Sequence, residues 1–116
     1  MQLRRRQRLA ETIREELEEI VNYELDDPRI GSVSVVEVVL SRDGRKAVAR
    51  IDPAGSGAEA EAALAALDRA KGYVRRLLAV RLELFQSPEV LFEAAFEPGP
   101  DAVARRAPGR GVEPAS

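Results

Sequence analysis

The spacing of apolar residues predicts two long helical regions. In residues 3–25 the apolar positions from Ala10 to Val21 follow the i, i+3, i+4 pattern of one buried helix face. Pro28 ends this region, because the residue before a proline disfavours helix. A second pattern starts near Gly57 and is interrupted at Gly72. A glycine inside a helix costs about 1 kcal/mol relative to alanine. The break at residues 70–72 is therefore either a plain kink or a junction between two helices.

Three segments have the alternating pattern of strands. Residues 33–40 form the first, residues 47–51 the second and residues 90–96 the third. The alternation slips near Val35-Val36, which predicts a bulge or burial on both faces. Asp43-Gly44 is typical of a turn, so the first two strands should form a hairpin. The order α-β-β-α-α-β predicts an α+β fold, with helices covering one face of a three-stranded sheet.

The end of the chain differs in composition from the rest. Residues 98–116 hold four of the seven prolines and three of the eight glycines, with few large apolar residues. We therefore expect one domain over residues 1–97, followed by a disordered tail that contains Pro, Gly and Arg.

The composition excludes several classes of chemistry. The chain has no Cys and no His, which excludes disulfides, cysteine-based zinc sites, thiol nucleophiles and imidazole catalysis. We expect no catalytic residue, no metal site, no cofactor and no enzymatic activity, although hydrolysis by carboxylates alone stays open. No apolar run is long enough to cross a membrane, and Leu9-Ala10-Glu11 follows the basic start where a secretory signal needs an apolar stretch. A soluble, cytoplasmic protein is expected.

Basic residues gather in three places although the net charge is −2. Residues 1–10 hold four arginines and no acid, residues 69–81 hold five basic residues and no acid, and the hairpin turn is also basic. Partners respond to such local potentials. The first two strands carry no aromatic residue, so base stacking on the sheet is not expected. We predict that RNA phosphates contact these residues: Arg4, Arg5, Arg8, Arg45, Lys46, Arg69, Lys71, Arg75 and Arg76.

Acidic residues on the first helix offer an alternative. A face with Glu15, Glu16, Glu18 and Glu19 could dock a basic protein, which would make the chain a protein–protein adaptor. The four arginines at the start could also be no more than a solvated helix end. Asp26-Asp27 is expected to cap and end the first helix rather than to form a catalytic carboxylate pair.

Four motifs in order resemble the ribosome-binding factor A family of bacterial ribosome-assembly factors, over about residues 4–97. They lie in residues 5–17 with 27–31 (Asp-Pro-Arg-Ile-Gly), residues 38–47, residues 66–75 (with Ala70, Lys71 and Gly72) and residues 87–92. The resemblance implies a KH type II-like fold, in which a helix–kink–helix with an Ala-x-Gly pattern replaces the usual nucleotide-clamping loop.

The same resemblance implies a function. It predicts a monomer without a membrane partner that binds the free 30S subunit and its 16S rRNA. It also predicts support of late 16S rRNA maturation, including the 5′-end region, and a link to cold adaptation. Glu83, Phe85 and Leu91 stand where relatives have arginines. This difference predicts weaker RNA binding, or binding shifted toward Arg4–Arg8 and Arg69–Arg76.

Overall fold

The computed structural model describes residues 2–53, 55 and 57–95, so the predicted tail over residues 98–116 lies outside the described residues. The elements are α1 (Leu3–Tyr23), β1 (Val33–Leu40), β2 (Lys46–Pro53), α2 (Ala58–Arg81) and β3 (Glu89–Ala94). Their bounds lie close to those that the periodicity predicts. The α+β class is confirmed.

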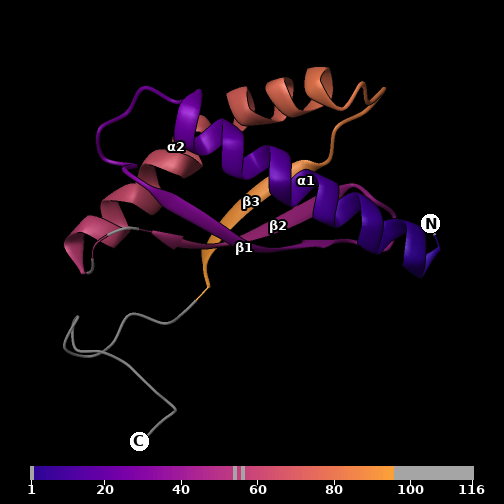
Figure 1. The fold of residues 1–116 in the computed structure, drawn as a ribbon, viewed down its shortest axis with the longest axis horizontal. Helices are drawn as coiled ribbons and strands as arrows, with labels where there is room; N and C mark the ends of the chain where they lie inside the picture. The colour runs from indigo at the N-terminus through magenta and orange to yellow at the C-terminus, as the bar shows by residue number, and fades with distance from the viewer. Residues whose placement is uncertain (1, 54, 56, 96–116) are drawn as a thin grey trace, which may run out of the picture.

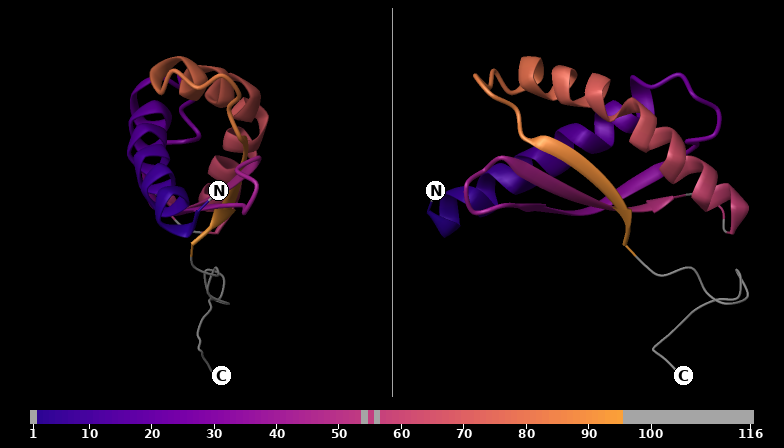
Figure 2. Two further views of the ribbon diagram at one scale, coloured as in Figure 1. Left: turned by 90° about the vertical axis from the view of Figure 1, so that its right-hand side faces the viewer. Right: turned by 180° about the vertical axis from the view of Figure 1, so that it is seen from behind.

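The sheet has three strands in the order β1-β2-β3. β1 and β2 form the predicted antiparallel hairpin, whereas β2 and β3 run parallel and are joined through α2. Both helices lie on the same face of the sheet (Figures 1 and 2). The parallel pairing places the start of β3 beside the start of β2, which is also the end of the hairpin turn.

The predicted slip in β1 is a β-bulge. Val35 pairs with Ile51 and Glu37 with Arg50, so Val36 has no partner in the register. Val36 is 47% exposed, and it is followed by the exposed Glu37, whereas Val35 and Val38 on either side of this pair are buried. One extra residue keeps both halves of β1 facing the core with their apolar side.

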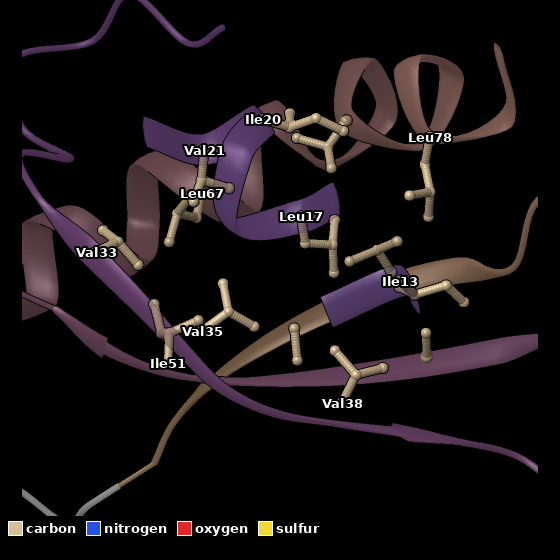
Figure 3. Close-up of a cluster of buried hydrophobic side chains, with 14 of the residues drawn as sticks. Ile13, Leu17, Ile20, Val21, Val33, Val35, Val38, Ile51, Leu67 and Leu78 are labelled. Atoms are coloured by element: carbon tan, nitrogen blue, oxygen red, sulfur yellow. The ribbon is translucent and has the colours of Figure 1, made fainter. Parts of the chain in front are cut away.

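Side chains from both helices and the sheet form the core. Ile13, Leu17 and Ile20 of α1 are fully buried, as are Ile51 of β2 and Leu67 of α2 (Figure 3). Each such side chain contributes roughly 1.5–3 kcal/mol through the removal of its apolar surface from water. The predicted helical face of residues 10–21 is thus the inner face of α1.

The region around Gly72 is one helix and not two. α2 runs for 24 residues through the predicted break, although its axis bends along its length (Figure 2). Gly72 is not among the residues with positive φ, so it stays in helical geometry. The cost of one glycine is smaller than the stabilisation from the buried face on both sides of it, including Leu67 and Val74. Of the two alternatives, the structure therefore contains the plain kink.

The expected capping role of Asp26-Asp27 is also wrong. α1 ends at Tyr23, and Glu24 closes it by donating its backbone N–H to Ile20 O. Asp27 instead organises the following turn, where its carboxylate accepts bonds from the backbone N–H of Arg29 at 3.0 Å and from Arg29 Nη2 at 2.7 Å. Local hydrogen bonding of this kind is the usual behaviour of Asp in turns.

Candidate RNA-binding surface

The basic residues of the described region fall into two groups. Five of them form ion pairs: Arg14, Arg29, Arg50, Lys71 and Arg81. The remaining ten form no ion pair with another described residue: Arg4, Arg5, Arg6, Arg8, Arg42, Arg45, Lys46, Arg69, Arg75 and Arg76. Eight of the nine predicted contact residues belong to the second group. Lys71 is the exception, because its Nζ lies 3.1 Å from Asp68 Oδ1.

Arg81 is the arginine with the most ion-pair partners in the described region. Its guanidinium contacts Glu19, lies 3.3 Å from Glu16 Oε1 and lies 2.6 Å from Glu24 Oε2. The bond to Glu19 is the main cause of the raised pKa of Arg81. Since the three glutamates belong to α1 and the residue after it, Arg81 ties the end of α2 to α1.

The same contacts bear on the acidic face that could dock a basic protein. Glu16 and Glu19 are bound by Arg81, and Glu18 accepts the backbone N–H of Val35 at 2.9 Å. Three of the four glutamates proposed for docking are therefore already engaged in contacts within the domain. This finding weakens the adaptor alternative.

The hairpin turn is braced so that its cations point outward. The Asp43 carboxylate accepts the backbone N–H of Arg45 at 3.0 Å and the hydroxyl of Ser41 at 2.8 Å, and these bonds lower the pKa of Asp43. The Ser41 hydroxyl in turn accepts the backbone N–H of Lys46 at 3.0 Å. Arg45 and Lys46 are exposed.

A cavity of about 750 Å³ joins this turn to α2. Arg75 of α2 lies in its wall together with Arg45 and Lys46. Two bonds hold the parts in register: Arg75 Nε donates to Ser87 O at 3.1 Å, and the Glu89 backbone N–H donates to Arg45 O at 2.8 Å. Three cations from two distant parts of the chain thus meet at one end of the sheet.

The first turns of α1 add charge at that end. Arg4, Arg5 and Arg8 are exposed, and Leu9 lines the cavity. Figures 1 and 2 show the start of α1 at the same end of the molecule as the hairpin turn. The helix begins without a side-chain cap and without an acidic residue in its first turn. Cations and helix dipole therefore combine into one positive region that attracts anions.

The other predicted cations of α2 lie apart from this cluster. The charge of Arg69 contributes to the low pKa of Asp27, which places Arg69 toward the loop between α1 and β1. The Arg76 guanidinium lies 5.9 Å from the centre of the Tyr73 ring. A heptad spacing puts Arg69 and Arg76 on one face of the helix, with the exposed Gly72 between them. The predicted residues therefore form a cluster at the hairpin end and a second strip along α2.

Sequence reasoning missed the walls of the cavity. Leu84 reaches it through a helix ending in which its backbone N–H donates to Ala79 O at 2.9 Å and that of Glu83 donates to Val80 O at 3.3 Å. Glu83 has a φ of 53°, a conformation in which glycine is the usual residue at this position of a helix end. No glycine marks the motif in the sequence, so the direction of the loop after α2 could not be predicted.

These features define a small α+β domain with a braced and exposed cationic surface. Residues 2–53, 55 and 57–95 contain no group of acidic side chains that could hold a metal ion. No helix in the same ranges is long and apolar enough to span a membrane.

Comparison with known proteins gives the family. The family model of ribosome-binding factor A matches residues 5–96. Ribosome-binding factor A from Solibacter usitatus is 42% identical, with the whole of both chains covered. The chain belongs to the ribosome-binding factor A family.

Solved structures agree with this assignment. The crystal structure of ribosome-binding factor A from Thermus thermophilus superposes with a TM-score of 0.71 at 29% identity, covering 78% of this chain and 94% of that one. A homology model of the Thermus thermophilus factor, fitted into a cryo-EM map of its complex with the 30S subunit, gives a TM-score of 0.64 at 27% identity over 76% of this chain and 92% of that one.

Proposed function

We propose that the protein binds the free 30S subunit and assists late maturation of its 16S rRNA. The observation that carries the proposal is the cluster of Arg45, Lys46 and Arg75, which meet at one end of the sheet without an ion-pair partner in the described region. The placement of a family member on the 30S subunit supports the choice of partner. The protein acts without chemistry of its own, as a monomer in the cytoplasm.

Binding by these residues is a matter of charge and shape. Arg4, Arg5 and Arg8 extend the cluster along α1, and Arg69 and Arg76 offer a second strip along α2. Each cation that neutralises an rRNA phosphate releases a counterion, so binding weakens steeply with salt. Phosphate contacts position a protein but do not read sequence. Specificity for the subunit then comes from the folded shape of the rRNA, which must fit the cluster at the hairpin end and the strip along α2 at the same time.

Residues 70–72 contribute to RNA binding because Gly72 has no side chain. Gly72 is exposed on α2 between Arg69 and Arg76, and a methyl group at this position would lie 3.9 Å from Arg76 Nη1. Because Gly72 has no Cβ, an RNA strand can approach the backbone of α2 closely at this position. Lys71 contributes least of the predicted residues, since Asp68 already neutralises it.

Sedimentation with purified 30S subunits tests the binding surface. The double variant Arg45→Gln/Arg75→Gln should bind at least about a hundredfold more weakly, because two charge-assisted hydrogen bonds of roughly 1.5–3 kcal/mol each are lost. The slope of log affinity against log salt should become shallower by about 1.5. The control is Arg14→Gln/Arg29→Gln, which removes the same charge from two arginines that are already paired and are not predicted contacts. Equal loss in both variants would show that net charge and not this cluster governs binding.

A second experiment addresses maturation. Depletion of the protein should leave 16S rRNA precursors with unprocessed 5′ ends, most strongly in cold-grown cells, and primer extension would detect them. Restoration by the wild type but not by Arg45→Gln/Arg75→Gln would connect maturation to the cationic cluster. Normal 5′ ends in depleted cells would limit the proposal to binding.

A further inference from the structure

The cavity beside the hairpin turn differs from the rest of the basic surface because it also has an apolar wall. The half-buried Leu9 and Leu84 line it together with Arg45, Lys46 and Arg75. Its volume of about 750 Å³ lies in the range of pockets that hold compact organic ligands. A flat contact with duplex phosphates would leave the apolar wall in water.

Several bonds fix this cavity before any ligand arrives. The bond from Glu89 N to Arg45 O joins the hairpin turn to β3. The bond from Arg75 Nε to Ser87 O holds the guanidinium against the loop that precedes β3. The helix ending at Glu83 turns Leu84 toward the cavity. A site held in this way loses little conformational freedom on binding, which favours affinity.

Three polar side chains of the cavity match the parts of a nucleotide, whereas the Asp43 carboxylate in its lining is already bonded to the Ser41 hydroxyl and the Arg45 backbone N–H. Arg75 uses Nε for Ser87, which leaves both terminal nitrogens for a phosphate in the fork geometry that guanidinium groups favour. Gln86 carries an amide that can both donate to and accept from a base edge. Glu89 also lines the cavity, and a carboxylate can accept a bond from an exocyclic base amine. An anion without such an amine gains nothing from Glu89.

We infer that this cavity takes one unstacked nucleotide of single-stranded rRNA. Its phosphate lies against Arg45, Lys46 and Arg75, and its base packs on Leu84 with its polar edge toward Gln86 and Glu89. The inference rests on the proposed function and sharpens it, since it makes the protein a reader of unpaired RNA. A paired nucleotide cannot enter without leaving its helix.

Fluorescence anisotropy with labelled hexaadenylate and with a labelled 12-base-pair RNA duplex tests the inference on the full chain. The wild type should bind the single strand about tenfold more tightly than a duplex end or side, since only the single strand fills the cavity. Leu84→Ser should weaken single-strand binding about fivefold through lost apolar contact, and duplex binding should not change. Leu84 lies outside the core cluster, so the fold should tolerate the change.

Val80→Ser is the matched control. Val80 is an aliphatic residue, 75% exposed, that does not line the cavity, so its loss should alter neither affinity. Should Leu84→Ser fail to fold, Gln86→Ala at an exposed position tests the contact with the base edge instead, and it should also weaken single-strand binding and leave duplex binding unchanged. Equal affinity of the wild type for both RNAs, or unchanged single-strand binding by the cavity variant, overturns the inference. Displacement of the RNA by polyglutamate at equal charge would overturn it in favour of an acidic peptide.

Sedimentation with 30S subunits distinguishes failure of the proposed function from failure of the nucleotide site. If the wild type does not sediment with 30S subunits, the proposed function fails. If it does sediment with them but lacks the single-strand preference, only the nucleotide site fails.

Discussion

Arg75 and Arg81 lie six residues apart on α2 and have opposite environments. Arg81 is surrounded by Glu16, Glu19 and Glu24, whereas the guanidinium of Arg75 bonds one backbone carbonyl and lines an open cavity. The difference arises from what each helix face meets, since Arg81 turns toward α1 and Arg75 toward the loop before β3. A basic residue is available to a partner only where the fold has not already neutralised it.

The net negative charge alone would suggest a protein that repels anionic partners. Much of the acidity lies on α1, where Glu16, Glu18 and Glu19 bind Arg81 or the backbone of β1. These glutamates are part of the internal structure, so their charge is partly compensated. A chain with a charge of −2 can therefore present an uncompensated cationic end to an anionic partner.

Reversal of Arg81 should give the largest effect on stability. Arg81→Glu brings four carboxylates together between α1 and α2, so we expect a clearly lower Tm in calorimetry at neutral pH and low salt. The fall should become smaller as salt is raised, because screening weakens repulsion among partly exposed charges. The corresponding change Arg75→Glu should leave Tm near the wild-type value while it weakens 30S binding.

The opposite ranking of these two variants would contradict the comparison. Loss of stability in Arg75→Glu would mean that its bond to Ser87 is essential to the fold. Normal stability in Arg81→Glu would mean that the packing of α1 on the sheet alone positions it.

Substitution of Gly72 should have a smaller effect, which raises stability and weakens binding. Gly72→Ala is expected to stabilise the free protein by about 0.5–1 kcal/mol, since the position is helical and the methyl group meets only the far end of Arg76. The same methyl group should weaken 30S binding if RNA approaches the helix here. Denaturant unfolding and sedimentation of one preparation measure both quantities. Stronger stability with unchanged binding would remove residues 70–72 from the interface.

The pair of Asp27 and Arg29 should give the smallest effect, and it depends on pH. Hydrogen bonds from the Arg29 side chain and backbone lower the pKa of Asp27 to about 2 from 3.8. The contribution of Asp27 to stability is therefore complete above about pH 4 and is lost as the pH falls toward 2. Asp27→Asn should lower Tm slightly at pH 6, and its Tm should converge with that of the wild type near pH 2. A constant difference over this range would exclude ionisation as the cause.

The sequence contains most of the fold because each element has its own local signal. The bulge at Val36 is visible as a slip in a period of two, and the hairpin as Asp43-Gly44 between two apolar runs. The predicted division of α2 is wrong because the propensity of one glycine counts for less than the buried face that continues past it. The position of Arg81 near the apolar side of the helix is a usable signal that it points inward.

The site could be predicted only in part. Charge runs indicate candidate residues, and most of these form no ion pair with another described residue. The meeting of Arg45 with Arg75 depends on the parallel pairing of β2 and β3, whose register no local pattern specifies. The cavity wall depends on a helix ending at Glu83 that lacks its usual glycine, so the sequence does not indicate Leu84 at all.

The bond between Glu89 N and Arg45 O has a consequence for the order in which the chain folds. The hairpin is a local structure and can close within microseconds. The pairing of β2 with β3 spans the whole of α2, and contacts across such a separation form late because a long loop must close first. The cationic cluster is complete only after that closure. A nascent or half-folded chain thus lacks the assembled surface, and acquires it together with the last strand of the sheet.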